Sequence, residues 1–219
     1  RFENIDLVLC RENIEGLYIG YEHYVPIDGD PHAVGMATGI NTRQGCRNIL
    51  KFAFDYAIAN GRKKVTVVHK ANVVRATDGL FLDTAREVAA RYPDIEFDEA
   101  NVDAMTMWLL KNPLSYDILV APNLYGDIVS DLCAQMVGGL GFACSGNIGD
   151  KLAVFEPTHG SAPKYAGQYK VNPIATILTV KMMLDWLGER DKAERLERAT
   201  AAVIKQGQVR TYDMGGRHT

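Results

Sequence analysis

Short apolar runs alternate along the chain with longer segments in which apolar residues recur every three or four positions. The runs are rich in valine, isoleucine and leucine and have the length of buried strands, whereas the longer segments have helical periodicity. Strands are predicted over 5–10, 64–69, 95–97, 116–121 and 153–156. Helices are predicted over 42–60, 77–91, 102–110, 173–187 and 190–206, the last two amphipathic, and another follows residue 121. This alternation predicts an α/β sheet with crossover helices.

Residues 16–39 interrupt this alternation. The segment is rich in tyrosine, histidine, glycine and proline and follows neither period. We interpret it as an excursion from the sheet, either a long loop or a small β-arm that reaches a partner subunit. Beyond it, Thr77-Asp78 is predicted to cap a helix, and Pro93 stops the same helix.

The composition excludes several classes of function. With 47% hydrophobic and 23% charged residues among 219, the chain can bury one large core or two smaller ones. A net charge of −3 provides no basic footprint for nucleic acid or an anionic membrane, and no apolar run could span a bilayer. The four scattered cysteines fit a reducing compartment, so we expect a cytoplasmic location. Because the strand-like segment 5–10 has nothing before it to pair with, we expect a fragment.

Two carboxylates, Asp127 and Asp131, follow the predicted strand over 116–121. Four residues apart on a helix, they share one face. Like charges at this spacing repel unless a cation lies between them, and hard oxygen ligands suit Mg²⁺ or Mn²⁺. A solvated acidic helix start, favoured by the helix dipole, is the alternative interpretation of the same pair.

Other polar residues also follow predicted strands. Arg11 offers a planar fork for a carboxylate, and Tyr18 is a phenolic proton donor close to it in sequence. A surface arginine and a core tyrosine are the alternatives. Lys70 comes directly after the strand over 64–69, where open α/β sheets bind ligands and where a lysine can act as a base.

Three more features concern ligand binding. Asp103 opens an apolar helix, where a carboxylate more often complements the helix dipole than binds a metal. The segment 156–167 combines small residues, which let the backbone approach a phosphate or ring, with histidine, lysine and tyrosine, although a Gly/Pro turn is the alternative. The run 139–144 nearly spells a dinucleotide fingerprint, but it follows a helix and ends in Cys144, so we do not interpret it as a Rossmann site.

In order along the chain, five motifs resemble those of the isocitrate/isopropylmalate dehydrogenase family of β-decarboxylating dehydrogenases. They are Arg11-Glu12-Asn13, Lys70-Ala71-Asn72, and the runs 123–131, 138–141 and 159–167. The resemblance implies an α/β, non-Rossmann fold with a small domain and part of a large one. It places the small domain in residues 1–137, with an inter-subunit clasp at about 16–42. Residues 138–219 would be the C-terminal part of the large, cofactor-binding domain.

The resemblance also implies roles for individual residues around the substrate. Arg11 would grip a substrate carboxylate, and Asn72 would also contact the substrate. Tyr18 would protonate the enol after CO₂ leaves. Lys70, from the other subunit, would assist removal of the hydroxyl proton.

The resemblance further implies a metal site and a cofactor site. Asp127 and Asp131 would bind Mg²⁺ or Mn²⁺, with Asp103 contributed by the partner chain. The residues that would hold the adenine-nucleotide half of the cofactor are His159, Gly160, Ser161, Ala162, Pro163, Lys164, Tyr165, Asn172 and Tyr212.

The implied activity is metal-dependent oxidative decarboxylation of a 2-hydroxy acid in a homodimer with shared active sites. Ile14-Glu15-Gly16 and the run 77–81 favour isocitrate as the substrate. Homoisocitrate dehydrogenase, 3-isopropylmalate dehydrogenase and a non-catalytic regulatory subunit are the alternatives. Lys164-Tyr165 and Tyr212 favour NADP over NAD, although Gly216 stands where the NADP pattern has an arginine.

Overall fold

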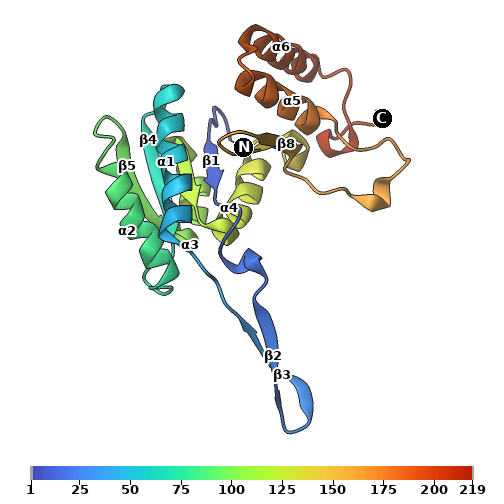
Figure 1. The fold of residues 1–219 in the computed structure, drawn as a ribbon. Helices are drawn as coiled ribbons and strands as arrows, with labels where there is room; N and C mark the ends of the chain where they lie inside the picture. Colours follow the sequence, from blue (N-terminus) through green and yellow to red (C-terminus); the bar gives the residue numbers. More distant parts are fainter. Residues whose placement is uncertain (1, 219) are drawn as a thin grey trace. The chain divides into compact units, whose positions relative to one another are not determined.

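The computed structural model describes residues 2–218, which form two compact units divided between Cys133 and Ala134. The elements of the first unit are β1 (Val8–Arg11), β2 (Glu22–Ile27), β3 (Asp30–Ala37), α1 (Arg43–Ala59), β4 (Lys64–His69), α2 (Thr77–Ala89), β5 (Glu96–Asn101), α3 (Val102–Lys111) and β6 (Ile118–Ala121) (Figure 1). α4 (Asn123–Met136) spans the division, and the second unit contains β7 (Cys144–Ile148), β8 (Ala153–Pro157), α5 (Ile174–Trp186) and α6 (Arg190–Gln206).

A four-stranded parallel sheet is the centre of the first unit. Its strand order is β1-β6-β4-β5, and every pair of neighbours is parallel. The carboxyl ends of all four strands therefore lie at one edge, where the chain leaves at Arg11, His69, Asn101 and Ala121. Open α/β sheets bind their ligands at this edge.

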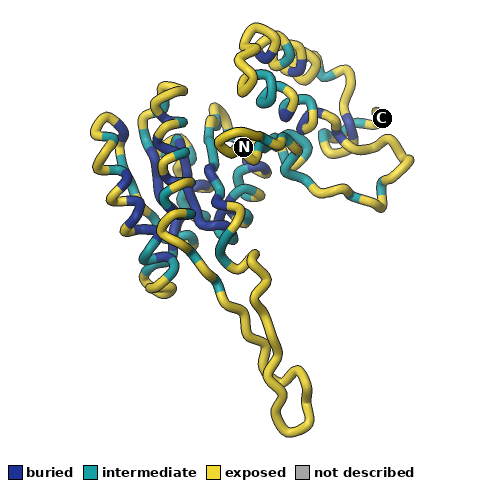
Figure 2. The backbone as a smooth tube through the Cα atoms, in the orientation of Figure 1, coloured by how far each residue is buried: buried dark blue, intermediate teal, exposed yellow. Residues whose placement is uncertain are grey.

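Helices α1 and α2 pack against one face of this sheet. Leu50 and Phe54 of α1 and Phe81 of α2 join strand residues such as Val65 and Val120 in a single buried cluster. β4 and β6 are buried along almost their whole length, as the dark blue segments in Figure 2 show, because helices cover both faces. The continuous apolar runs of the sequence reflect this double burial.

The excursion predicted at 16–39 is a β-arm. β2 and β3 form an antiparallel hairpin in which every residue is exposed, drawn as the yellow projection in Figure 2. A bridge between Gly16 and Ile40 closes its base. There the Glu15 carboxylate accepts a hydrogen bond from the Thr42 backbone N–H at 2.7 Å, while the Thr42 hydroxyl caps α1 by accepting from Gly45 N–H. The arm is thus fixed to the start of α1.

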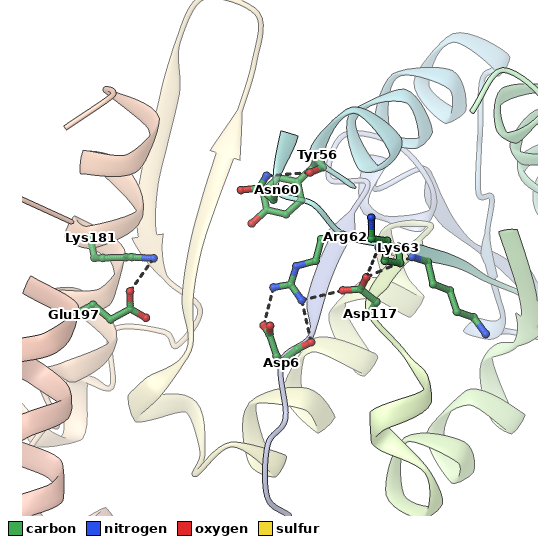
Figure 3. Close-up of polar contacts among 9 residues, drawn as sticks. Asp6, Tyr56, Asn60, Arg62, Lys63, Asp117, Lys181 and Glu197 are labelled. Carbon is green, nitrogen blue, oxygen red and sulfur yellow. Dashed lines mark hydrogen bonds and ion pairs between the residues drawn. The ribbon is translucent and has the colours of Figure 1, made fainter. Parts of the chain in front are cut away.

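The second unit pairs β7 with β8 in an antiparallel ribbon that contacts α5, and α5 packs against α6. Lys181 of α5 joins the two helices through an ion pair with Glu197 at 3.2 Å (Figure 3).

The strand β7 was not predicted, because its sequence Cys-Ser-Gly-Asn-Ile has no apolar alternation. The helix predicted at 173–187 is confirmed as α5, but it is not amphipathic, since it is apolar on most of its surface and exposes Val180 and Trp186.

Two other predictions in the first unit need correction. Thr77-Asp78 does not cap α2: no side chain caps this helix, and Asp78 is buried instead. β5 is twice as long as the predicted 95–97 strand, because this edge strand is largely polar and lacks the apolar signal of the central strands. Among the described residues no helix is long and apolar enough to cross a membrane. The assignment of the two units to a small and a large domain stays a prediction.

Arg62 ties the amino-terminal edge of the sheet together (Figure 3). Its guanidinium pairs with Asp6, before β1, at 2.7 Å and with Asp117, before β6, at 2.8 Å. The other oxygen of Asp117 accepts a hydrogen bond from the Lys63 backbone N–H at 2.8 Å. The Asp117 carboxylate therefore holds the starts of β4 and β6 in register.

We expect Asp117→Ala to lower the free energy of unfolding by about 1–3 kcal/mol, because it leaves the half-buried Arg62 and the Lys63 N–H without this acceptor. Urea unfolding followed by circular dichroism measures the change. The control is Asp94→Ala, at an exposed position in the turn before β5, which should stay within about 0.5 kcal/mol of the unaltered protein. Equal losses in the two variants would contradict this account of the edge.

Candidate active site at the carboxyl edge of the sheet

Arg11 and Asp127 form the centre of a polar group at the carboxyl edge. Arg11 is the last residue of β1, and its Nη1 pairs with Asp127 Oδ1 at 2.5 Å. The other Asp127 oxygen accepts a hydrogen bond from the Tyr18 hydroxyl at 2.7 Å, and the Arg11 guanidinium lies 5.1 Å from the centre of the Tyr18 ring. Three residues separated by up to 116 positions thus meet around one carboxylate.

The local sequence explains why these groups meet. Glu12 is buried, and its carboxylate accepts hydrogen bonds from Ile14 and Glu15 N–H, which turns the chain directly after β1. Asn123, at the start of α4, accepts from Arg11 Nη2 at 2.8 Å. Gly126 must lack a side chain, because a Cβ there would lie 2.5 Å from Arg11 Cγ.

The hydrogen bond to Asp127 raises the pKa of Tyr18 above its ordinary value, with the negative charge of Asp127 adding to the effect. The phenol therefore keeps its proton through the neutral range. Its ring is about half exposed, at 52%, so a bound molecule can reach the hydroxyl. Tyr18 is positioned as a proton donor beside an anionic centre.

Lys70 and Asp103 form a second pair at the same edge. Lys70 follows β4, Asp103 lies in the first turn of α3 after β5, and Lys70 Nζ donates to Asp103 Oδ1 at 2.6 Å. This hydrogen bond lowers the pKa of Asp103. Asn72 lies exposed in the turn after Lys70. The two residues for which the sequence implied a role in the partner's active site thus occur together.

The predicted metal ligands fit a divalent ion in part. Asp127 and Asp131 lie one turn apart on α4, and Asp131 is exposed. Mg²⁺ is usually held by one or two carboxylates, with water and substrate oxygens completing an octahedron, so this pair is a suitable donor set. No cluster of three or more metal-ligating side chains occurs within residues 2–218, so the chain does not bring Asp103 to the other two acids. A contribution of Asp103 from a partner stays a prediction.

The predicted cofactor residues lie in the second unit. Gly160, Ser161 and Ala162 precede a short 3-10 helix, Pro163–Tyr165, and Ala162 adopts a φ of 43°, which is uncommon for a residue other than glycine. His159 Nε2 is buried without a hydrogen-bond partner. A buried ring nitrogen of this kind is costly unless a ligand or water satisfies it.

Asn172 is fixed by its neighbours in the second unit. It is buried, donates to Asp213 Oδ2 at 2.9 Å and accepts from Ile174 N–H at 3.0 Å, which holds the start of α5. A Cβ at Gly141 would lie 2.9 Å from its amide nitrogen, so the glycine-rich run 138–141 serves close packing. Asn172 therefore connects the start of α5 to Asp213 and packs against Gly141.

Tyr165 and Tyr212 lie beside a hollow of about 350 Å³ that is also lined by Lys170, Arg217 and His218. The ring centres are 5.8 Å apart, and Lys164 Nζ lies 5.0 Å from the centre of the Tyr165 ring. The hydrogen bond with Tyr212, followed by the charge of Lys164, lowers the pKa of Tyr165. The cationic side chains of Lys170 and Arg217 line the hollow, which therefore suits an anion.

Sequence reasoning missed several residues that build these sites. Asn123 and Gly126 lie within a motif that was recognised, yet their contacts with Arg11 depend on β1 and β6 being neighbours. The NADP pattern has an arginine at the position of Gly216, and in this chain Arg217 directly follows that glycine. A Cβ at Gly216 would lie 2.0 Å from the Arg210 carbonyl oxygen, so a side chain is excluded there, whereas Arg217 reaches the hollow.

The chain is similar to known proteins along its whole length. The whole chain, residues 1–219, matches the family described as isocitrate/isopropylmalate dehydrogenase. The chain is 49% identical over 218 residues to a probable isocitrate dehydrogenase (NAD) subunit alpha, mitochondrial, of Caenorhabditis elegans, covering 100% of this chain and 60% of that protein. It is 45% identical over 214 residues to a homoisocitrate dehydrogenase of Methanocaldococcus jannaschii, covering 98% of this chain and 59% of that protein.

A solved structure confirms the fold. The crystal structure of isocitrate dehydrogenase from Methylococcus capsulatus superposes with a TM-score of 0.95 at 46% identity, covering 99% of this chain and 64% of that one. The chain spans about 60% of the length of the curated relatives. A relative named for NAD does not support the expected preference for NADP. The predicted α/β fold is confirmed, and the chain belongs to the isocitrate/isopropylmalate dehydrogenase family.

Proposed function

We propose that the protein carries out metal-dependent oxidative decarboxylation of isocitrate, with reduction of a nicotinamide dinucleotide. The observation that carries the proposal is the meeting of Arg11, Tyr18 and Asp127 at the carboxyl edge of the sheet. A guanidinium, a protonated phenol and a carboxylate are the groups that a hydroxy acid needs for binding, protonation and metal chelation. The family match adds the reaction class.

Asp127 and Asp131 would hold the divalent ion, which when bound polarises the oxygens of the substrate and stabilises negative charge that develops on them. Arg11 presents two parallel N–H groups and can bind a substrate carboxylate in place of Asp127. Tyr18 then delivers its proton to the carbon that CO₂ leaves, since its hydroxyl already points into this group of residues.

Lys70 would assist removal of the proton from the substrate hydroxyl in the active site of the partner subunit. Its ion pair with Asp103, at 2.6 Å, holds the two side chains together at the carboxyl edge of the sheet. Asn72 would contact the substrate from the same turn. This assignment requires a homodimer, in which each site takes Arg11, Tyr18 and Asp127 from one chain and Lys70 from the other.

The exposed β-arm supports such a dimer. An isolated two-stranded hairpin is marginally stable in water, and its free edges attract further strands. Tyr24, Val25, Ile27, Val34 and Met36 are all between 37% and 61% exposed on this arm. We propose that the same arm of a second copy covers them.

The second unit would bind the adenosine end of the dinucleotide. The buried, unpartnered His159 Nε2 supports a ligand at the loop, and the hollow beside Tyr165 and Tyr212 supports an anionic group. We propose NADP, whose extra phosphate would meet Lys170 and Arg217. The hollow supports this proposal, whereas the relative named for NAD does not.

A second candidate substrate is homoisocitrate, which the relative from Methanocaldococcus jannaschii favours. 3-Isopropylmalate and a non-catalytic regulatory role remain alternatives. Retention of Tyr18, Lys70 and Asp127 in these contacts supports a catalytic subunit. The cytoplasmic location likewise stays a proposal.

We expect Asp127→Asn in the full-length protein to lower kcat/KM for isocitrate with Mn²⁺ by roughly a thousandfold, corresponding to about 4 kcal/mol of lost charge stabilisation. NAD(P)H absorbance and a Mn²⁺ titration measure turnover and metal affinity separately. Asp150→Asn, exposed in the second unit, is the control. Unchanged metal affinity and unchanged turnover in Asp127→Asn would contradict the proposed reaction.

We expect Arg217→Ala to raise KM for NADP about tenfold, the effect of losing one charge-assisted contact, while KM for NAD changes less than about twofold. Steady-state kinetics with both cofactors make the comparison, and Lys151→Ala, at an exposed site of the same unit, serves as the control. If the unaltered enzyme has a higher kcat/KM with NAD than with NADP, the proposed cofactor preference is wrong.

We expect the double substitution Val25→Arg and Val34→Arg to convert the protein from dimer to monomer, because the two valines lie opposite each other on the arm and would bring like charges into the interface. Light scattering after size-exclusion chromatography measures the mass. Ile58→Arg, an exposed apolar position on α1, is the control. A dimer that survives the double substitution would show that the arm does not hold the subunits together.

A further inference from the structure

Asp78 is a buried carboxylate that none of the roles above uses. It lies in the first turn of α2, and only 4% of its surface is exposed. A carboxylate that merely complements a helix dipole can stay in water, and a buried one is unfavourable unless hydrogen bonds compensate it. Its burial therefore depends on specific partners.

The first partner is the main chain of Lys70. Asp78 Oδ2 accepts a hydrogen bond from the Lys70 N–H at 2.7 Å. Lys70 is the first residue after β4, and its side chain leaves the sheet at this point toward Asp103. Asp78 thereby fixes the backbone from which the Lys70 side chain projects.

The second partner is Tyr125 in α4. Its hydroxyl interacts with the Asp78 carboxylate through a hydrogen bond and through the charge of Asp78. Tyr125 lies two residues before Asp127 on the same helix. A single carboxylate thus connects the end of β4 to the helix that carries the proposed metal ligands.

We propose that Asp78 is a positioning residue of the active site: it fixes Lys70 relative to α4 through the Lys70 N–H and the Tyr125 hydroxyl, without contacting the substrate. The proposal rests on the proposed role of Lys70 in catalysis. Proton transfer depends on placement within about an ångström, and a loss of that placement costs on the order of tenfold to a hundredfold in rate. Asp78 would therefore affect kcat and leave substrate and metal binding almost unchanged.

The test compares Asp78→Ala with Asp78→Asn in the full-length protein. Asparagine keeps an acceptor for the Lys70 N–H and can donate to the Tyr125 oxygen, whereas alanine provides neither. We expect kcat with isocitrate and Mn²⁺ to fall between tenfold and a hundredfold in Asp78→Ala and less than about threefold in Asp78→Asn. KM for isocitrate and the Mn²⁺ dissociation constant should change less than about threefold in either variant.

Hydrogen exchange at the Lys70 amide, measured by fragmentation mass spectrometry, is the readout that does not depend on activity. Exchange at the Lys70 amide should be at least about tenfold faster in Asp78→Ala and unchanged in Asp78→Asn. Exchange at the Val67 amide, within β4, should be unchanged in both variants. The matched control is Asp83→Ala, which removes an exposed carboxylate from the same helix. If Asp78→Ala does not fold, Tyr125→Phe tests the link to α4, with an expected loss of kcat and normal Lys70 exchange.

The proposal is overturned if Asp78→Ala changes kcat and Lys70 exchange no more than Asp83→Ala does. It is also overturned if alanine and asparagine at position 78 lower kcat equally. Absence of turnover in the unaltered protein would instead refute the proposed function, and Lys70 exchange would still decide whether Asp78 holds the end of β4. The two failures are therefore distinguishable.

Discussion

The parallel alignment of β1, β6, β4 and β5 is the constraint on which the site depends. Because all four strands point the same way, their carboxyl ends open at one edge, and the residues that follow them are brought together. Arg11 follows this rule directly, and Lys70 and Asp103 lie just beyond β4 and β5. An antiparallel strand in the sheet would send its polar end to the opposite edge and separate these groups.

Charge compensation around this edge explains the rest of the local architecture. Asp127 carries a negative charge that Arg11 balances, and Asp103 is balanced by Lys70. These partially exposed pairs contribute little to stability, but they hold the side chains of Arg11 and Lys70 in place at this edge. The opposite edge differs, since the half-buried Arg62 joins Asp6 and Asp117 and serves the fold.

Much of the fold was accessible from sequence, and the reasons are physical. β4 and α6 were predicted with their observed bounds, because a doubly buried strand needs a continuous apolar run and an amphipathic helix needs a 3.6-residue period. β5 and β7 gave weaker signals, because an edge strand and a ribbon strand bury little apolar surface. The prediction that Thr77-Asp78 caps α2 was wrong. The sequence places an acid at the start of a helix but does not show whether its side chain faces water or the protein interior.

By itself, the sequence determined the α/β class, the family and the identity of the chemical groups, because hydrophobic periodicity and motif order are written along the chain. Only the tertiary structure decided which groups meet: Arg11 with Asp127 and Asn123, Lys70 with Asp78 and Asp103, and Arg217 with Tyr165 at the hollow. Such contacts join residues up to 116 positions apart. They depend on strand order, and strand order follows from how the whole chain buries its apolar surface rather than from any local pattern.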